Sequence, residues 1–187
     1  MNDNFLKSYD KLMSLEHSKP QNCLHINKNE NGFTFRGIYQ TAHPKLKIWD
    51  LIEQYLREYH YLDFKTNSKD LHDNEYLNKL CQEFYKNNFW DRAKLDKIYS
   101  LKKCQEIFIF GVNAGMSTAI RKAQKILNVS IDGIIGNVTL NALNSFNEDD
   151  FDIIFDEYEI KYYKDIINKN QSFKIFENGW KKRALSV

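Results

Sequence analysis

Glu16 is the side chain whose type and position best suit acid chemistry. It ends an apolar stripe at helical spacing that includes Phe5, Tyr9, Leu12 and Met13. Partial removal of a carboxyl group from water favours its protonated form, and a general acid must carry a proton near neutral pH. The pattern alone favours a simpler interpretation, a glutamate at a helix end that reaches solvent.

Two residues of the following segment could complete an acid–base pair with Glu16. Thr34 carries a hydroxyl that can hold water, and Glu30 carries a carboxylate that can act as a base. The alternatives are a β-forming threonine in a hairpin and a solvated loop charge. A mechanism with a single acid also stays open.

Asn113 and a glycine-containing loop are also considered as ligand contacts. Asn113 offers two donors and an acceptor, which would suit the N-acetyl group of a sugar, although the Asn-x-Gly spacing favours a cap for the helix that follows near Gly115. Asp132, Gly133 and Gly136 suit a tight turn closed by the aspartate, rather than a ligand contact.

No cofactor or metal site is predicted. The five histidines lack metal-binding spacing, and the three cysteines form no Cys-x-x-Cys pair. We find no Ser-His-Asp set, phosphate loop or nucleotide fingerprint. His25 could approach the acid from its loop, whereas His17 should face another side of the helix than Glu16.

The elements that must position these residues are mainly helical. The chain has 187 residues, an apolar fraction of 42% and only 2 prolines and 7 glycines, which favours a folded, mainly α single domain with two lobes. A small hairpin is expected near residues 31–38, and residues 20–36 otherwise resemble a long loop, with a polar turn at Asp63–Asp73. Helices are predicted at 5–16, 46–61, 74–85, 105–112, 117–128, 137–143 and 149–168, with shorter ones after Asp91 and before Leu185.

The organisation predicted is a catalytic lobe over residues 1–100 and a second lobe over residues 101–187. The N-terminus lacks the apolar stretch of a signal peptide, and no run is long enough to span a membrane. A net charge of +2 is too small to indicate nucleic acid as a partner. A DNA-binding regulator built on residues 117–143 is the weakest hypothesis, because the second predicted helix of that segment has no cation to read bases.

Ordered motifs along most of the chain resemble glycoside hydrolase family 108, a family of N-acetylmuramidases that includes phage endolysins. The motifs are Glu16, Gly32-Phe33-Thr34-Phe35-Arg36-Gly37-Ile38, Phe89-Trp90, Val112-Asn113-Ala114-Gly115, Asp132-Gly133-Ile134-Ile135-Gly136-Asn137-Val138-Thr139-Leu140 and Gly179-Trp180-Lys181-Lys182-Arg183. The C-terminal half carries the stronger part of the resemblance. The family shows Glu-Gly-Gly-Tyr at its catalytic position, whereas His17-Ser18-Lys19 follows Glu16 here.

The resemblance implies a lysozyme-like fold with an N-terminal catalytic part and a C-terminal peptidoglycan-binding-like part. It implies that Glu16 is the general acid for the β-1,4 bond between N-acetylmuramic acid and N-acetylglucosamine, with Thr34 and Glu30 beside it. Asn113, Gly37 and Tyr39 are then expected to contact substrate. We expect peptidoglycan as the partner, no cofactor, a monomer, and synthesis in the cytoplasm followed by release to the wall through a holin or a secretion system. The alternative is a peptidoglycan-binding protein with a degenerate, inactive site.

Overall fold

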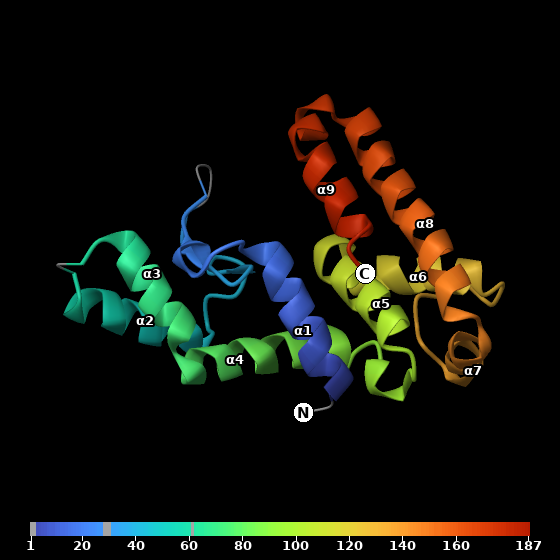
Figure 1. The fold of residues 1–187 in the computed structure, drawn as a ribbon, viewed down its shortest axis with the longest axis horizontal. Coiled ribbons are helices and arrows are strands. Elements are labelled where there is room, and N and C mark those ends of the chain that lie inside the picture. The colour runs from blue at the N-terminus through green and yellow to red at the C-terminus, as the bar shows by residue number, and fades with distance from the viewer. Residues whose placement is uncertain (1–2, 28–30, 61) are drawn as a thin grey trace. The chain divides into compact units, whose positions relative to one another are not determined.

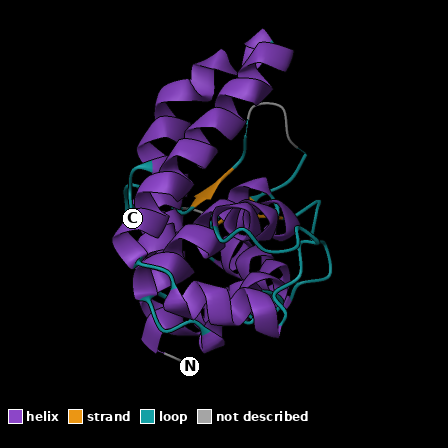
Figure 2. Ribbon diagram, turned by 90° about the vertical axis from the view of Figure 1, so that its right-hand side faces the viewer, coloured by secondary structure: helices purple, strands orange, loops and turns teal. Residues whose placement is uncertain are grey.

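The chain is mainly α-helical, as predicted from its sequence. A computed structural model describes residues 3–27, 31–60 and 62–187. Within these residues, helices dominate and the strands are short (Figures 1 and 2). The α-helices are α1 Asp3–Glu16, α2 Lys47–Glu58, α3 Phe64–Asp73, α4 Glu75–Tyr85, α5 Leu101–Ala114, α6 Met116–Ile126, α7 Asn137–Ser145, α8 Glu148–Lys169 and α9 Glu177–Ala184. Short 3₁₀ helices lie at Pro20–Asn22, Leu95–Lys97 and Gln171–Phe176, and a π-helical turn lies at Lys86–Trp90.

The structure divides into two compact units. One unit comprises Tyr9–Lys86, and the other combines Met1–Ser8 with Asn87–Val187. Helix α1 therefore contributes its first part to one core and its last two turns to the other. The division into a lobe over residues 1–100 and a lobe over residues 101–187 stays a prediction.

The Tyr9–Lys86 unit has its core between α1, α4 and a small sheet. Tyr9, Leu12 and Met13 of the predicted stripe are buried. The Tyr9 hydroxyl donates to Asn78 Oδ1 over 3.1 Å, and the Tyr9 ring lies 5.8 Å from the ring of Tyr85. These contacts fix the last turns of α1, and with them the direction in which Glu16 leaves the helix.

The hairpin expected near residues 31–38 is present, with a third strand that the sequence did not predict. Strands β1 Leu24–His25, β2 Thr34–Phe35 and β3 Ile38–Tyr39 form an antiparallel sheet in that order. The turn residues Arg36 and Gly37 have φ angles of 49° and 80°. Two positive φ angles define the turn type whose twist suits a two-residue hairpin.

The prediction of a polar turn over Asp63–Asp73 was wrong, because most of that segment is helix α3. The Asp63 carboxylate accepts hydrogen bonds from the backbone N–H groups of Lys65 and Thr66, which caps the helix. Asn67, Ser68 and Leu71 are buried, and the Ser68 hydroxyl donates to the Pro20 carbonyl. A polar composition concealed the helix because its buried face is itself partly polar.

The larger unit is built around α5, which is buried on most of its surface. Helices α6 and α8 pack against α5, and α9 returns alongside α8 (Figure 1). The predicted helix after Asp91 is replaced by the π-helical turn and the 3₁₀ helix that flank it. Helix α6 begins after Gly115, which has a φ angle of 93°, so its first residue lies one position before the predicted start at residue 117. Trp90 and Trp49, each in its own unit, are buried core residues.

Candidate active site

Glu16 is the last residue of α1, and its side chain is half-buried. The preceding stripe residues are held in the core, so the helix delivers the carboxylate to the edge of that core. This is the position predicted from the stripe.

Gly37 lies directly against the Glu16 carboxylate. A Cβ atom added at Gly37 would lie 2.8 Å from Glu16 Oε2 and 2.8 Å from the Tyr85 hydroxyl oxygen. That hydroxyl donates to the Arg36 carbonyl over 2.8 Å, which fixes the hairpin turn on α4. The absence of a side chain at Gly37 thus leaves room for the Glu16 carboxylate next to the turn. The predicted contact between Gly37 and substrate is a different role and stays a prediction.

Thr34 and Tyr39 share one row across the sheet with His25. Thr34 is the register partner of both His25 and Tyr39, and directly opposed residues of antiparallel strands project from the same face. His25 also lines the pocket that contains Glu16. The threonine itself is buried, so its hydroxyl is sheltered from bulk water.

A pocket of about 640 Å³ opens beside Glu16, entirely within the Tyr9–Lys86 unit. Its volume is in the range of small-molecule and sugar-sized sites. The lining residues are Glu16, His17, Ser18, Gln21, Asn22, Leu24, His25, Ile26, Phe64 and Lys65. Glu16 is the one carboxylate among them. Glu30, the predicted base, lies outside the described residues.

His17, which lines the pocket, has His72 and Arg36 as neighbours. The His17 ring lies 5.5 Å from the ring of His72, edge to face. Burial, followed by the nearby charges of Arg36, His72 and His25, lowers the pKa of His17 from 6.5 to about 4. Arg36 is itself buried and donates to the His72 carbonyl. His17 is therefore neutral at physiological pH.

Phe64 and Lys65, which the sequence reasoning did not select, form part of the pocket wall. Phe64 is 40% exposed and stacks on Phe33, with ring centroids 6.3 Å apart. Both residues follow the Asp63 cap, and the Asp-x-x-Thr spacing of Asp63 and Thr66 was the signal that could have revealed their helix. Tyr85 was also missed, because a tyrosine ending an apolar stripe resembles any core residue.

Asn113 belongs to the other unit, near the end of α5. Its side-chain amide donates to the Tyr163 hydroxyl over 2.7 Å, although the residue is exposed. Tyr163 in turn stacks on Trp180 of α9, with centroids 4.9 Å apart. The amide therefore serves helix packing, and its predicted contact with a sugar stays a prediction.

The glycine-containing loop after α6 is shaped by its own side chains, as predicted. The Asp132 carboxylate accepts from the backbone N–H of Ile134, closing an Asx-turn. Gln124 is fully buried below the loop. Its amide nitrogen donates to Asp132 Oδ1, to the Ile134 carbonyl and to Thr139 Oγ1, and its oxygen accepts from the Gly133 N–H.

Comparison with known proteins supports a role at the cell wall. Residues 118–185 match the family described as "Predicted Peptidoglycan domain". No curated protein sequence matches the chain. The fold is similar to the solved structure of Brucella abortus SagA, with a TM-score of 0.63 and 20% sequence identity over 96% of this chain and 88% of that chain. The domain match indicates a peptidoglycan-associated protein.

Within the described parts of the chain, no helix combines the length and the apolar character that crossing a membrane requires.

Proposed function

We propose that this protein is a peptidoglycan hydrolase of the N-acetylmuramidase type, with Glu16 as its general acid. One observation carries the proposal: a half-buried carboxylate at a helix end lies against the backbone of Gly37 and faces a pocket of about 640 Å³. The match of residues 118–185 to a peptidoglycan domain supports the choice of substrate.

In the proposed reaction, Glu16 donates its proton to the glycosidic oxygen as the bond from that oxygen to the anomeric carbon breaks. A water molecule attacks the anomeric carbon and gives a proton to a base. Glu30 is proposed as the base. Thr34 stays the predicted water-orienting residue, although it is buried and is not among the residues that line the pocket. If water enters opposite the leaving group, the configuration at the anomeric carbon inverts.

The rim of the pocket suits a glycan with anionic substituents. Phe64 presents a partly exposed ring, already stacked on Phe33, that can lie along the apolar face of a sugar. Lys65 adds an exposed cation for the carboxylate of a muramic acid or of a stem peptide. Aromatic walls with a few placed polar groups are typical of such sites.

A second function is a peptidoglycan-binding protein that does not cleave. The observation in its favour is that the matched domain, residues 118–185, does not include Glu16. His17, Ser18 and Lys19 also replace the glycines and tyrosine of the family that the N-terminal motifs resemble. Both functions require binding to the wall, and only the first requires bond cleavage.

The two functions can be distinguished with purified sacculi, by measuring binding to the sacculi and clearing of their suspension on the same sample. We expect the wild-type protein to clear the suspension and the Glu16→Gln variant to bind but to clear at least about 10²-fold more slowly, the usual range being 10²–10⁴. Glu83→Gln, at an exposed acid of α4, is the matched control and should clear normally. Binding without clearing by the wild-type protein would favour the second function, and equal clearing by Glu16→Gln would exclude Glu16 as the acid.

A further inference from the structure

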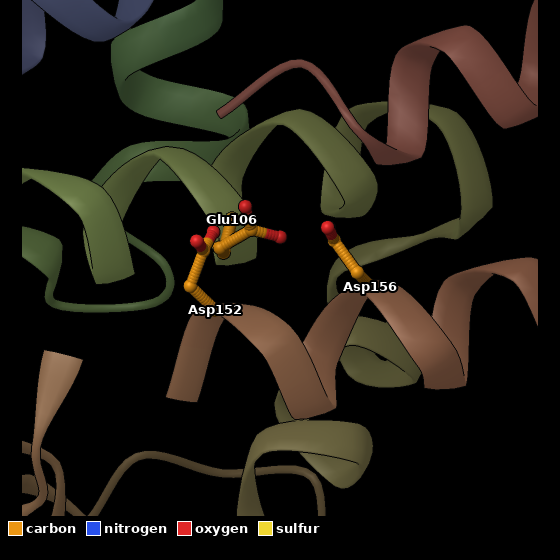
Figure 3. Close-up of side chains that lie close together, drawn as sticks. All are labelled: Glu106, Asp152 and Asp156. Carbon is orange, nitrogen blue, oxygen red and sulfur yellow. The ribbon is translucent and has the colours of Figure 1, made fainter. Parts of the chain in front are cut away.

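A second group of acidic side chains lies within the larger unit, between α5 and α8. Glu106 projects from α5 toward Asp152 and Asp156, which stand one turn apart on α8 (Figure 3). One carboxylate oxygen from each of the three lies within 4.8 Å of the others. Three oxygen donors therefore converge on one small volume.

Glu106 is the unusual member of this group because it is buried without a partner for one oxygen. The residue is 1% exposed, and its Oε1 atom accepts no hydrogen bond. The buried Oδ1 atom of Asp156 also accepts none. Buried polar atoms are nearly always hydrogen-bonded, so an exception calls for an explanation, and a bound ion or water is one.

The surrounding charges leave this group strongly acidic. Glu159, one turn further along α8, is 3% exposed and adds a fourth carboxyl group. Lys102 lies 3.4 Å from Asp152 but is shared with Asp149 at 2.9 Å. Ionised carboxylates this close together repel one another, and a bound cation would remove that repulsion.

We propose that Glu106, Asp152 and Asp156 form a binding site for a divalent cation, specifically Ca²⁺. All-oxygen donors suit hard cations such as Ca²⁺ and Mg²⁺. At Ca–O distances of about 2.3–2.6 Å, two ligands on opposite sides stand about 4.6–5.2 Å apart, which accommodates the observed spacing of up to 4.8 Å. For Mg²⁺ the corresponding limit is about 4.2 Å, which is a tighter constraint on three carboxylate ligands.

Such an ion would connect α8, which lies inside the matched segment, to α5, which lies outside it. Asp152 and Asp156 lie within residues 118–185, whereas Glu106 precedes them on α5. Water can complete the coordination from the side of the two half-buried aspartates. The ion would hold the peptidoglycan-associated segment to α5, and this inference does not depend on the proposed muramidase activity.

The test uses the full chain, freed of divalent ions with a chelator, and titrates it with CaCl₂ in a calorimeter. We expect one site with a dissociation constant of roughly 10⁻⁵–10⁻³ M. The melting temperature should rise by about 5–10 °C at saturating Ca²⁺ and by less with MgCl₂.

Variants locate the ion. Glu106→Gln preserves the shape of the side chain and should abolish the heat of binding and the shift in melting temperature. Asp156→Asn, at a partly exposed position, gives the same test if Glu106→Gln does not fold. Glu157→Gln, an exposed neighbour on α8, should bind Ca²⁺ like the wild type. No binding by the wild type, or unchanged binding by Glu106→Gln or Asp156→Asn, would overturn the proposal.

Discussion

At the level of single residues, the position of the Glu16 carboxylate depends on a neighbour that has no side chain. Gly37 has a φ angle of 80°, and the space where its Cβ would stand is occupied by Glu16 Oε2 and the Tyr85 hydroxyl. The glycine therefore has two functions: it permits the hairpin turn and admits the acid.

Replacing Gly37 with alanine should impair both the hairpin turn and the placement of the Glu16 carboxylate. We expect the free energy of unfolding to fall by roughly 1–2 kcal/mol from the left-handed backbone alone. We also expect sacculus clearing to slow by on the order of 10²-fold, because the acid must move. Urea unfolding and turbidity measure the two effects.

Gly179→Ala is the matched control, because nothing lies within 4 Å of its Cβ position in α9. That change should leave clearing intact and stabilise the helix by about 0.5–1 kcal/mol. A Gly37→Ala variant that clears sacculi as fast as the wild type would show that the acid does not need this close approach.

At the level of elements, the sequence predicted the apolar helices well and the polar ones poorly. Apolar spacing located α1, α2, α4, α6 and α8, and paired glycines located the hairpin. Helix α3 escaped because its burial depends on Asn67 and Ser68, whose hydrogen bonds no periodicity reveals. The strand at Leu24–His25 escaped for a similar reason, since its partner Thr34–Phe35 lies across a long loop.

The candidate site was predicted in the same uneven way. Glu16 followed from the stripe and from the motif order, and the structure brings it together with Gly37. The spacing of Asp63 and Thr66 could have revealed the helix of Phe64 and Lys65. No local pattern, however, shows that these two residues and Tyr85 lie near Glu16, because that depends on tertiary contacts between segments far apart in the sequence. Asn113 lies in a different unit from Glu16.

The loop after α6 offers a test at this scale. Gln124→Ala would leave the Gly133 N–H, the Ile134 carbonyl and the Thr139 hydroxyl without their present partner. We expect the free energy of unfolding to fall by about 2–4 kcal/mol, because buried polar groups then lack hydrogen bonds. Asn141→Ala, at an exposed position of α7, should change it by less than about 0.5 kcal/mol in the same urea titration. Equal effects of the two changes would contradict the role assigned to Gln124.

At the level of the whole molecule, buried carboxyl groups should govern how stability changes with pH. Burial, with a smaller effect from Asp156, raises the pKa of Glu159 from 4.5 to about 9. A group whose pKa is raised by folding stabilises the protein fully below its unfolded pKa, and this contribution is lost as the pH rises through the folded value. Glu106 and Asp156, which face the same space, act in the same direction, and the nearby Arg183 opposes the shift at Glu159.

Glu159→Gln should therefore match the wild type in stability near pH 4 and exceed it increasingly from pH 4.5 toward about 9. Thermal unfolding in the presence of a chelator measures the difference, with Glu157→Gln as the exposed control. His17 changes stability in the opposite sense, since its lowered pKa costs stability as the pH falls from 6.5 toward about 4. Because both proteins retain His17, that effect cancels in the comparison. A constant difference between Glu159→Gln and wild type across this range would contradict the burial of a protonated Glu159.

The central claim, that Glu16 cleaves the glycan as a general acid, is tested most directly by mass analysis of digested peptidoglycan. The wild-type protein should release disaccharide-peptides whose reducing end is N-acetylmuramic acid, and Glu16→Gln should release almost none while still binding sacculi. Fragments that end in N-acetylglucosamine, cleavage within the peptides, or the same products from Glu16→Gln would contradict it.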